Sequence, residues 1–310
     1  MHIREANQND IPGILSVLKA SLGETSSKKT EEVWKYKHLD NPFGESLVLI
    51  AETAGMIIGV RAFMRWKWKM SGKEYSAFRA VDTATHPSHQ GKGIFKKLTL
   101  KALEIGKQNG DQFVFNTPNR QSKPGYLKMG WKEVGKIKTT LIPVNPIYWS
   151  RKKDLNFFGS MVNEISPELL QEWNTKLEAN NVIYTPKTSN YLSWRYCHNP
   201  LQEYMLEIDE NVFLAGYLKH HSNLKELRLS ELIMSSKANK KFVKKKIRDW
   251  AKDSGAHFIS LSSSINQGLF RKRITAEVGP VLTYIPINNS HQEFYNLSSW
   301  DYSLGDLELF

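Results

Sequence analysis

The chain has 310 residues, of which 40% are hydrophobic, and carries a formal net charge of +12. This length suits two domains, and the apolar content is sufficient for globular cores. The single cysteine, Cys197, excludes an intramolecular disulfide framework. No apolar run approaches the roughly 18 residues of a membrane span, and the first residues lack the pattern of a signal peptide. We therefore expect a soluble cytoplasmic protein whose charge favours anionic partners.

The first elements read as a strand, a helix and a pair of long strands. Residues 2–6 predict a strand, and Asn9 or Asp10 caps a helix with Pro12 near its first turn. Residues 65–69, RWKWK, alternate basic and aromatic side chains, so both tryptophans fall on one face of a strand. That face suits either a sugar ring or burial against a neighbouring domain.

A glycine loop follows the next strand. Residues 80–85 are β-type, Gly91 and Gly93 follow a proline, and an amphipathic helix begins near Ile94. Glycine lets backbone N–H groups close on an anion, and the helix N-terminus adds its unsatisfied donors and positive dipole end. The sequence matches neither the Gly-Lys-Ser/Thr phosphate loop nor the complete Gly-x-Gly-x-x-Gly fingerprint. It nevertheless predicts a pyrophosphate site.

A second cluster of polar and aromatic residues lies downstream of this helix. Gly110 ends the helix, and residues 112–117 read as a buried strand. Asn119 follows, with Tyr126 seven residues later, then Gly130 and Trp131.

Together these residues resemble the GNAT family of N-acetyltransferases. The loop is similar to the family's coenzyme A motif, Gln/Arg-x-x-Gly-x-Gly/Ala, with Gln90 and Gly93 in place and Phe95 where Gly or Ala is usual. The downstream spacing resembles the family's Asn-x-x-Ala-x-x-x-Tyr-x-x-x-Gly-Phe pattern. The resemblance implies a mixed-sheet α/β GNAT fold, an acyl-CoA N-acyltransferase, and acetyl-CoA as co-substrate. It assigns the following cofactor contacts: Thr83, Ala84, Thr85, Gln90, Gly91, Lys92, Gly93, Ile94, Phe95 and Asn119.

The resemblance also suggests catalytic groups. In the family the tyrosine often protonates the departing CoA thiolate, so Tyr126 is the candidate general acid, with a core tyrosine as the alternative. Where many members carry a glutamate base, this chain has Arg79; Asp82 on the same strand is the candidate base, directly or through water. Alternatively, Asp82 faces solvent or pairs with Arg79. His86 and His89 lack further ligands nearby, so no metal is expected.

The second half of the chain repeats the first. Four pairs of segments match in the same order, which we interpret as an internal repeat. In the second copy the glycine loop is missing, and Phe270 stands in place of Tyr126. We therefore expect a catalytic domain at 1–145 and a degenerate GNAT-like domain at 150–310, with a boundary in the proline-containing segment 142–148. The matching pairs are 34–42 with 194–200, two extended runs containing Gly59 or Gly216, 110–115 with 255–260, and 126–135 with 270–279.

The acceptor is the least defined part. We expect the acceptor to be the primary amine of a small molecule, and the candidates are an anionic acceptor, an amino sugar or a sugar nucleotide. The alternatives are a tandem-GNAT aminoacyltransferase of the peptidoglycan type and a non-catalytic acyl-CoA-binding protein. The lysine-rich segment 237–249 reads as the solvated face of a helix, and nucleic acid is not expected as a partner. The apolar tail, 300–310, either docks on the second domain or places Asp306, Glu308 or the terminal carboxylate near the reaction centre.

Overall fold

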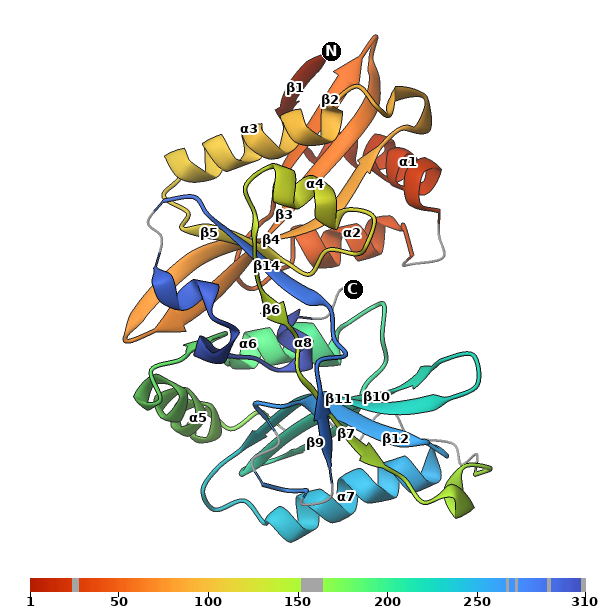
Figure 1. The fold of residues 1–310 in the computed structure, drawn as a ribbon, viewed down its shortest axis with the longest axis vertical. Helices are drawn as coiled ribbons and strands as arrows, with labels where there is room; N and C mark the ends of the chain where they lie inside the picture. The colour runs from red at the N-terminus through yellow and green to blue at the C-terminus, as the bar shows by residue number, and fades with distance from the viewer. Residues whose placement is uncertain (24–27, 152–163, 266–267, 271–272, 289–290, 308–310) are drawn as a thin grey trace.

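The computed structural model describes residues 1–23, 28–151, 164–265, 268–270, 273–288 and 291–307. Two mixed β-sheets with flanking helices lie one above the other along the long axis of the molecule (Figure 1). The mixed α/β architecture confirms the expected fold class. No helix within the described residues has the length and apolarity needed to cross a membrane.

The first sheet has the strand order β1-β2-β3-β4-β5-β14-β6. All neighbours are antiparallel except β4 and β5, which are parallel. Two short strands, β8 and β15, extend it beside β3. The strands are β1 (His2–Glu5), β2 (Leu47–Thr53), β3 (Met56–Met70), β4 (Lys73–Thr85), β5 (Phe113–Asn116), β6 (Lys132–Lys136), β8 (Ile183–Tyr184), β14 (Val281–Pro286) and β15 (Trp300–Asp301).

The second sheet has the order β13-β7-β12-β11-β10-β9, in which only β11 and β12 are parallel. The order of antiparallel and parallel pairings across this sheet is therefore the same as in the first sheet, counted from β6 back to β2. The strands are β7 (Thr139–Pro143), β9 (Met205–Asp209), β10 (Val212–His220), β11 (Lys225–Met234), β12 (Phe258–Ser262) and β13 (Ile274–Ala276).

The two halves of the chain exchange one strand each. β14, from the second half, lies between β5 and β6 of the first sheet, and β7, from the first half, lies between β12 and β13 of the second. The predicted boundary segment 142–148 includes the end of β7, where Pro143 is paired with Phe258. Neither sheet is therefore built from one continuous half of the chain.

The helices cover both faces of each sheet (Figure 1). Ile94, Leu98 and Ala102 recur at helical spacing and bury α3 in the same core cluster as Tyr126. α1 and α2 pack on the opposite face, which is shared with elements of the second half. The helices are α1 (Ile11–Leu22), α2 (Glu31–His38), α3 (Ile94–Gln108), α4 (Lys123–Lys128), α5 (Pro167–Ala179), α6 (Ser189–Leu192), α7 (Lys240–Asp253) and α8 (Leu304–Leu307). Short helical turns are η1 (Gln8–Asp10), η2 (Pro87–His89), η3 (Pro146–Tyr148), η4 (Ser193–Cys197), η5 (Gln292–Tyr295) and η6 (Leu297–Ser299).

The tryptophans of β3 belong to this shared core. Trp66 and Trp68 are fully buried. The Trp66 indole donates to the Thr185 hydroxyl at 3.0 Å, and Trp68 meets Trp300 edge to face at 4.8 Å. Of the two readings of this face, burial against the second half is therefore the one that the structure shows.

Candidate functional site

The glycine loop forms an open concavity at the start of α3. Gly91 and Gly93 have φ angles of 76° and 72°, which side-chain-bearing residues rarely adopt. A Cβ added at either glycine would meet no atom within 4 Å. Gly93 is the N-cap of α3 and provides no side-chain cap, so the first N–H groups of this helix are left for another acceptor. Gln90 donates to the Thr85 carbonyl at 3.3 Å and ties the loop to the end of β4.

The corresponding helix of the second half is closed at the same place. The Asn239 side chain caps α7 by accepting from the backbone N–H groups of Lys241 and Phe242. The donors that α3 leaves open are therefore already used in α7. This contrast agrees with the prediction that an anion-binding loop is present only in the first half.

β4 has an unpaired edge next to the loop. Its ladder with β5 ends at the pair Arg79 and Phe115, although β4 continues to Thr85. A bulge at Asp82, which has a φ of 37°, shifts the register so that Arg61 lies opposite Thr83. The segment 83–85, which is predicted to contact the cofactor, therefore lies where no described strand pairs with β4 on the β5 side.

Tyr126 joins the loop to this edge. Its ring is buried against Phe95, with centroids 5.5 Å apart, and its hydroxyl accepts a hydrogen bond from Arg61 Nη1 at 2.7 Å. The same Nη1 donates to the Thr83 hydroxyl, which in turn donates to the Val81 carbonyl. The structure thus brings together three predicted residues and adds Arg61, which sequence reasoning missed.

Asp82 lies on the other side of β4, against α2. It forms an ion pair with Lys37 and accepts from His38 Nε2 at 3.0 Å, while His38 Nδ1 lies 2.8 Å from the Ser46 hydroxyl. Burial alone would raise the pKa of Asp82, but the charge of Lys37 and the hydrogen bond from His38 hold it well below its usual range. Burial lowers the pKa of His38. Asp82 is therefore a fixed carboxylate and a weak proton acceptor, and it pairs with Lys37 rather than with Arg79.

Arg79 instead contacts the short helix α8. Its guanidinium donates to the backbone carbonyls of Asp306 and Leu307 in α8. The Asp306 carboxylate is buried and accepts from Lys187 at 2.8 Å and from the Tyr191 hydroxyl at 2.8 Å. The tail therefore docks through residues 304–307, and the Asp306 carboxylate is used in that docking. Glu308 and the terminal carboxylate lie outside the described residues.

Asn119 sits apart from these groups. Its side-chain oxygen accepts from the backbone N–H groups of Gln121 at 3.1 Å and Ser122 at 2.8 Å, which shapes the turn before α4. Its assignment as a cofactor contact stays a prediction.

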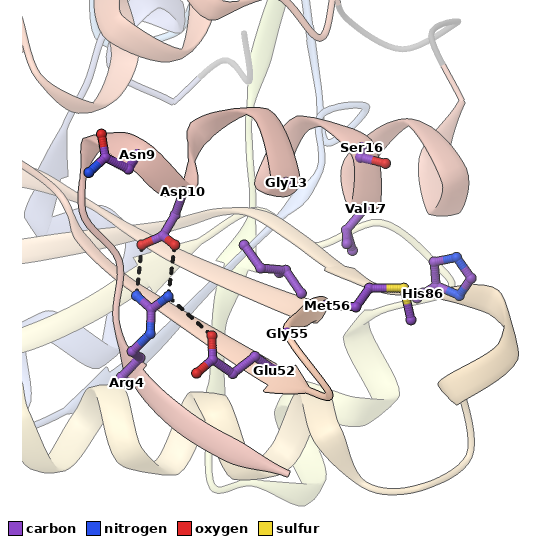
Figure 2. Close-up of a pocket in the computed structure, with 11 residues that line it drawn as sticks. Arg4, Asn9, Asp10, Gly13, Ser16, Val17, Glu52, Gly55, Met56 and His86 are labelled. Atoms are coloured by element: carbon purple, nitrogen blue, oxygen red, sulfur yellow. Dashed lines mark hydrogen bonds and ion pairs between the residues drawn. The ribbon is translucent and has the colours of Figure 1, made fainter.

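A pocket of about 410 Å³ lies between β1, α1 and the hairpin that joins β2 to β3, with His86 at its border (Figure 2). The Arg4 guanidinium is the cation of this pocket, and it forms two hydrogen bonds with Asp10, at 2.7 and 2.8 Å, and a third with Glu52 at 3.1 Å. Its charge is thus compensated within the protein, and the pocket offers no free cation to a phosphate. Elsewhere in the described part of the chain, no group of three or more His, Cys, Asp or Glu side chains is arranged to hold a metal ion.

Comparisons with known proteins agree with this geometry. Residues 2–134 match the family model described as an acetyltransferase (GNAT) domain. A probable N-acyltransferase from Enterococcus faecalis has a TM-score of 0.65 at 9% identity, over 92% of this chain and 72% of that one. A GCN5-related N-acetyltransferase from Anabaena variabilis has a TM-score of 0.65 at 13% identity, over 93% and 73%. A putative acetyltransferase from Pyrococcus horikoshii has a TM-score of 0.57 at 13% identity, over 99% and 94%. No curated sequence matches the chain.

The match to an acetyltransferase domain supports a transferase enzyme, and the fold, the glycine loop and the unpaired strand edge agree with that class. More specifically, the match to a GNAT acetyltransferase domain covers residues 2–134, and members of that family generally use acetyl-CoA.

Proposed function

We propose that the protein transfers an acetyl group from acetyl-CoA to the primary amine of a small acceptor, at one site in the first half of the chain. The observation that carries this proposal is the open glycine loop at the unpaired edge of β4, directly beside the buried hydroxyl of Tyr126. The same open loop argues against an aminoacyl-tRNA donor, because such a reaction does not require a pyrophosphate site.

The glycine loop would hold the pyrophosphate of acetyl-CoA. Backbone N–H groups of residues 90–95 are the donors, and Gly91 and Gly93 leave room for the phosphate oxygens to approach the backbone. The unpaired backbone groups of residues 83–85 would pair with the pantetheine arm, in the manner of an added strand.

Tyr126 would act on the leaving sulfur. The amine nitrogen attacks the thioester carbon, the carbon–sulfur bond breaks, and the sulfur leaves with the electron pair of that bond. Tyr126 gives its proton to this sulfur. Because the low pKa of Asp82 makes it a poor base, we propose that water removes the excess proton from the amine, while Asp82 keeps Lys37 and His38 in place.

The acceptor would approach from the junction of the two halves. A pocket of about 530 Å³ lies between α2 and η4 and is lined by the carboxylates of Glu32 and Asp40 and by the rings of Tyr36 and Trp194. Carboxylates attract a protonated amine, and aromatic rings suit a cation or a sugar face. This supports an amino sugar as one acceptor class.

The second half would act as a degenerate GNAT-like copy, with domains at about 1–145 and 150–310. Support comes from the matching strand order of the sheets and from the side-chain cap that closes α7. Phe270, in the place of Tyr126, is buried and cannot donate a proton.

The test is an assay of thiol release. The protein is incubated with acetyl-CoA and a panel of amines, amino sugars and nucleotide-linked amino sugars, and free CoA is measured. We expect amine-dependent release by the wild type and none by Gly93→Asp. Lack of acetyl-CoA binding by the wild-type protein in calorimetry would refute the proposal.

A further inference from the structure

Arg61 is a buried cation that has no counter-ion among the described residues. Its side chain is 0% exposed, and no carboxylate of the described residues pairs with it. Its Nε and Nη2 atoms are buried and meet no hydrogen-bond acceptor in the described parts of the chain. An arginine stays charged in proteins, and burying a charge without a partner is strongly unfavourable. Such an arrangement is expected where a bound ligand supplies the missing negative charge.

The surroundings of Arg61 keep its charge in place. The guanidinium carbon lies 4.6 Å from the ring centroid of Phe63, 5.5 Å from that of Phe95 and 5.2 Å from that of Tyr126. Ring faces attract a cation but do not neutralise it. Two other buried cations differ in this respect, since Lys37 pairs with Asp82 and Lys187 with Glu231. Arg79, which is also buried, donates instead to the backbone carbonyls of Asp306 and Leu307.

The contact with Arg61 also fixes the direction of the Tyr126 hydroxyl. A guanidinium only donates hydrogen bonds, so the Tyr126 oxygen is the acceptor in the 2.7 Å contact. The hydroxyl proton must then point elsewhere, and none of the described residues accepts it. Arg61 therefore presents Tyr126 as a donor with a free proton.

We infer that Arg61 is a positioning residue that orients Tyr126 toward the departing sulfur. Its positive charge also stabilises the negative charge that forms on the Tyr126 oxygen when the proton leaves. This inference rests on the proposed function. As the carbon–sulfur bond breaks, its electron pair stays on sulfur, and the Tyr126 proton moves to that sulfur to give the CoA thiol. The tyrosinate that remains is an anion beside the guanidinium, and it regains a proton from the one that water removes from the amine. No oxidant or further reactant is needed.

The experiment compares Arg61→Met, Arg61→Lys, Tyr126→Phe and the double variant with Met and Phe in steady-state kinetics. We expect Arg61→Met to lower kcat about 10²-fold, within the range of general acid catalysis, and to leave the dissociation constant of acetyl-CoA unchanged. Arg61→Lys, which retains the positive charge, should keep more activity than Arg61→Met. In the Tyr126→Phe background the Met substitution should cost little further activity, because the two residues act as a unit.

A merely structural role predicts different results. In the double variant, Met and Phe replace both partners of the hydrogen bond with apolar groups and remove an uncompensated charge. If Arg61 acts in catalysis as inferred, the melting temperature of the double variant should therefore be no lower than that of Tyr126→Phe. An equal loss of kcat in both backgrounds, a Lys variant no better than the Met variant, or a melting temperature that falls together with activity would each overturn the inference. If Arg61→Met fails to fold, the comparison of Arg61→Lys with Arg61→Gln serves the same purpose.

The two proposals fail in distinguishable ways. A wild-type protein that neither binds acetyl-CoA nor releases thiol would refute the proposed function. If the wild-type protein acetylates amines and the Arg61 variants have the same kcat as the wild type, only the role of Arg61 is refuted.

Discussion

Two buried charged residues of the first sheet, Asp82 and Arg61, differ in whether the protein compensates their charge. Asp82 is held by Lys37 and His38, and this set of contacts is complete within the protein. Arg61 keeps two nitrogen atoms without an acceptor among the described residues. A complete network fixes structure, whereas an incomplete one is a feature of binding and catalytic sites. The face of the sheet on which Arg61 and Tyr126 meet is therefore where we place the chemistry.

Tyr126→Phe tests that chemistry directly. Phe keeps the packing on Phe95 but removes the only proton that this ring can donate. We expect kcat to fall by about 10²–10⁴-fold, the usual contribution of general acid catalysis, with an unchanged dissociation constant for CoA. Turnover equal to that of the wild type, under conditions where the chemical step limits the rate, would assign Tyr126 to core packing instead.

Asp301 gives a pH-dependent prediction for stability. Burial raises the pKa of this carboxyl to about 6, with Asp306 and Glu231 acting in the same direction and Lys187 opposing them. A carboxyl whose pKa is raised in the folded state makes folding less favourable as pH rises from about 4 to about 6. Asp301→Asn should therefore raise the free energy of unfolding by about 3 kcal/mol above pH 7 and have no effect below pH 4.

Urea unfolding of the wild type and Asp301→Asn at pH 4 and pH 8 measures this difference. Glu104→Gln on the exposed face of α3 is the control, because Glu104 makes only a surface pair with Lys101. A stabilisation of Asp301→Asn that is the same at both pH values would contradict the assignment.

The two ends of the glycine loop could be predicted from the sequence because their signal is local. Gly91 and Gly93 adopt the left-handed backbone that their residue type permits, and α3 begins at Ile94 as expected. Arg61 could not be predicted, since an arginine inside the apolar run 56–64 gives no information about whether a counter-ion reaches it. The sequence signal for Arg61 is that a charged residue interrupts an otherwise apolar strand.

Among the elements, α3 and α7 show how one helix type is opened or closed at its N-terminus. Gly93 leaves the first donors of α3 free, whereas Asn239 occupies those of α7. Free donors and the positive end of the helix dipole favour an anion, and a capped end competes with it.

A matched pair of variants tests the difference. Gly93→Asn and Gly93→Asp are nearly equal in size, and both residue types tolerate a positive φ, so they differ mainly in charge. We expect Gly93→Asp to abolish CoA binding in calorimetry, because a carboxylate then faces the pyrophosphate, and Gly93→Asn to retain measurable binding. Ala238→Asp, beside the N-terminus of α7, should leave the affinity unchanged. Equal losses from Gly93→Asp and Ala238→Asp would contradict a single site.

Sequence patterns could predict the helix starts and the strands of the first half, but they could not predict which strands pair with each other. β7 follows β6 and β14 follows β13 along the chain, and each occupies a similar position in the sheet of the other half, β14 between β5 and β6 and β7 between β12 and β13. Periodicity describes which face of a strand is buried, but it does not identify the partner strand. The exchange depends on the direction of the two connecting segments, which is a property of tertiary structure.

At the scale of the molecule, the exchanged segments cross at one point. The Ile137 backbone N–H donates to the Pro280 carbonyl at 2.9 Å, and the Gly279 N–H donates to the Ile137 carbonyl at 3.1 Å. A Cβ on Gly279 would lie 2.6 Å from Ile137 Cβ, so only glycine allows this approach. The crossing joins the two halves through backbone contacts as well as through the shared core.

A fragment of residues 1–144 tests the dependence between the halves. It would lack β14, so β5 and β6 would lose their common neighbour, and β7 would have no sheet to join. Because unpaired strand edges and exposed apolar faces promote association, we expect the fragment to aggregate and to release no thiol from acetyl-CoA. Gel filtration and the thiol assay measure both properties.

A control for this fragment carries the sequence of residues 281–286 in place of residues 139–143. This change supplies the missing strand within the first half, and we expect it to improve solubility. A monomeric and fully active 1–144 fragment would show that the first sheet does not need the strand from the second half.

The strand exchange also has a consequence for the order in which the protein is made. A ribosome releases residues in sequence, so β5 and β6 leave the exit tunnel long before β14, which begins at Val281. Until then the first sheet of the nascent chain lacks the strand between β5 and β6, and it is completed only when β14 has been translated. Contacts between residues so far apart in sequence slow folding, and holding the gap open in that interval is a task suited to a chaperone that binds exposed strand edges.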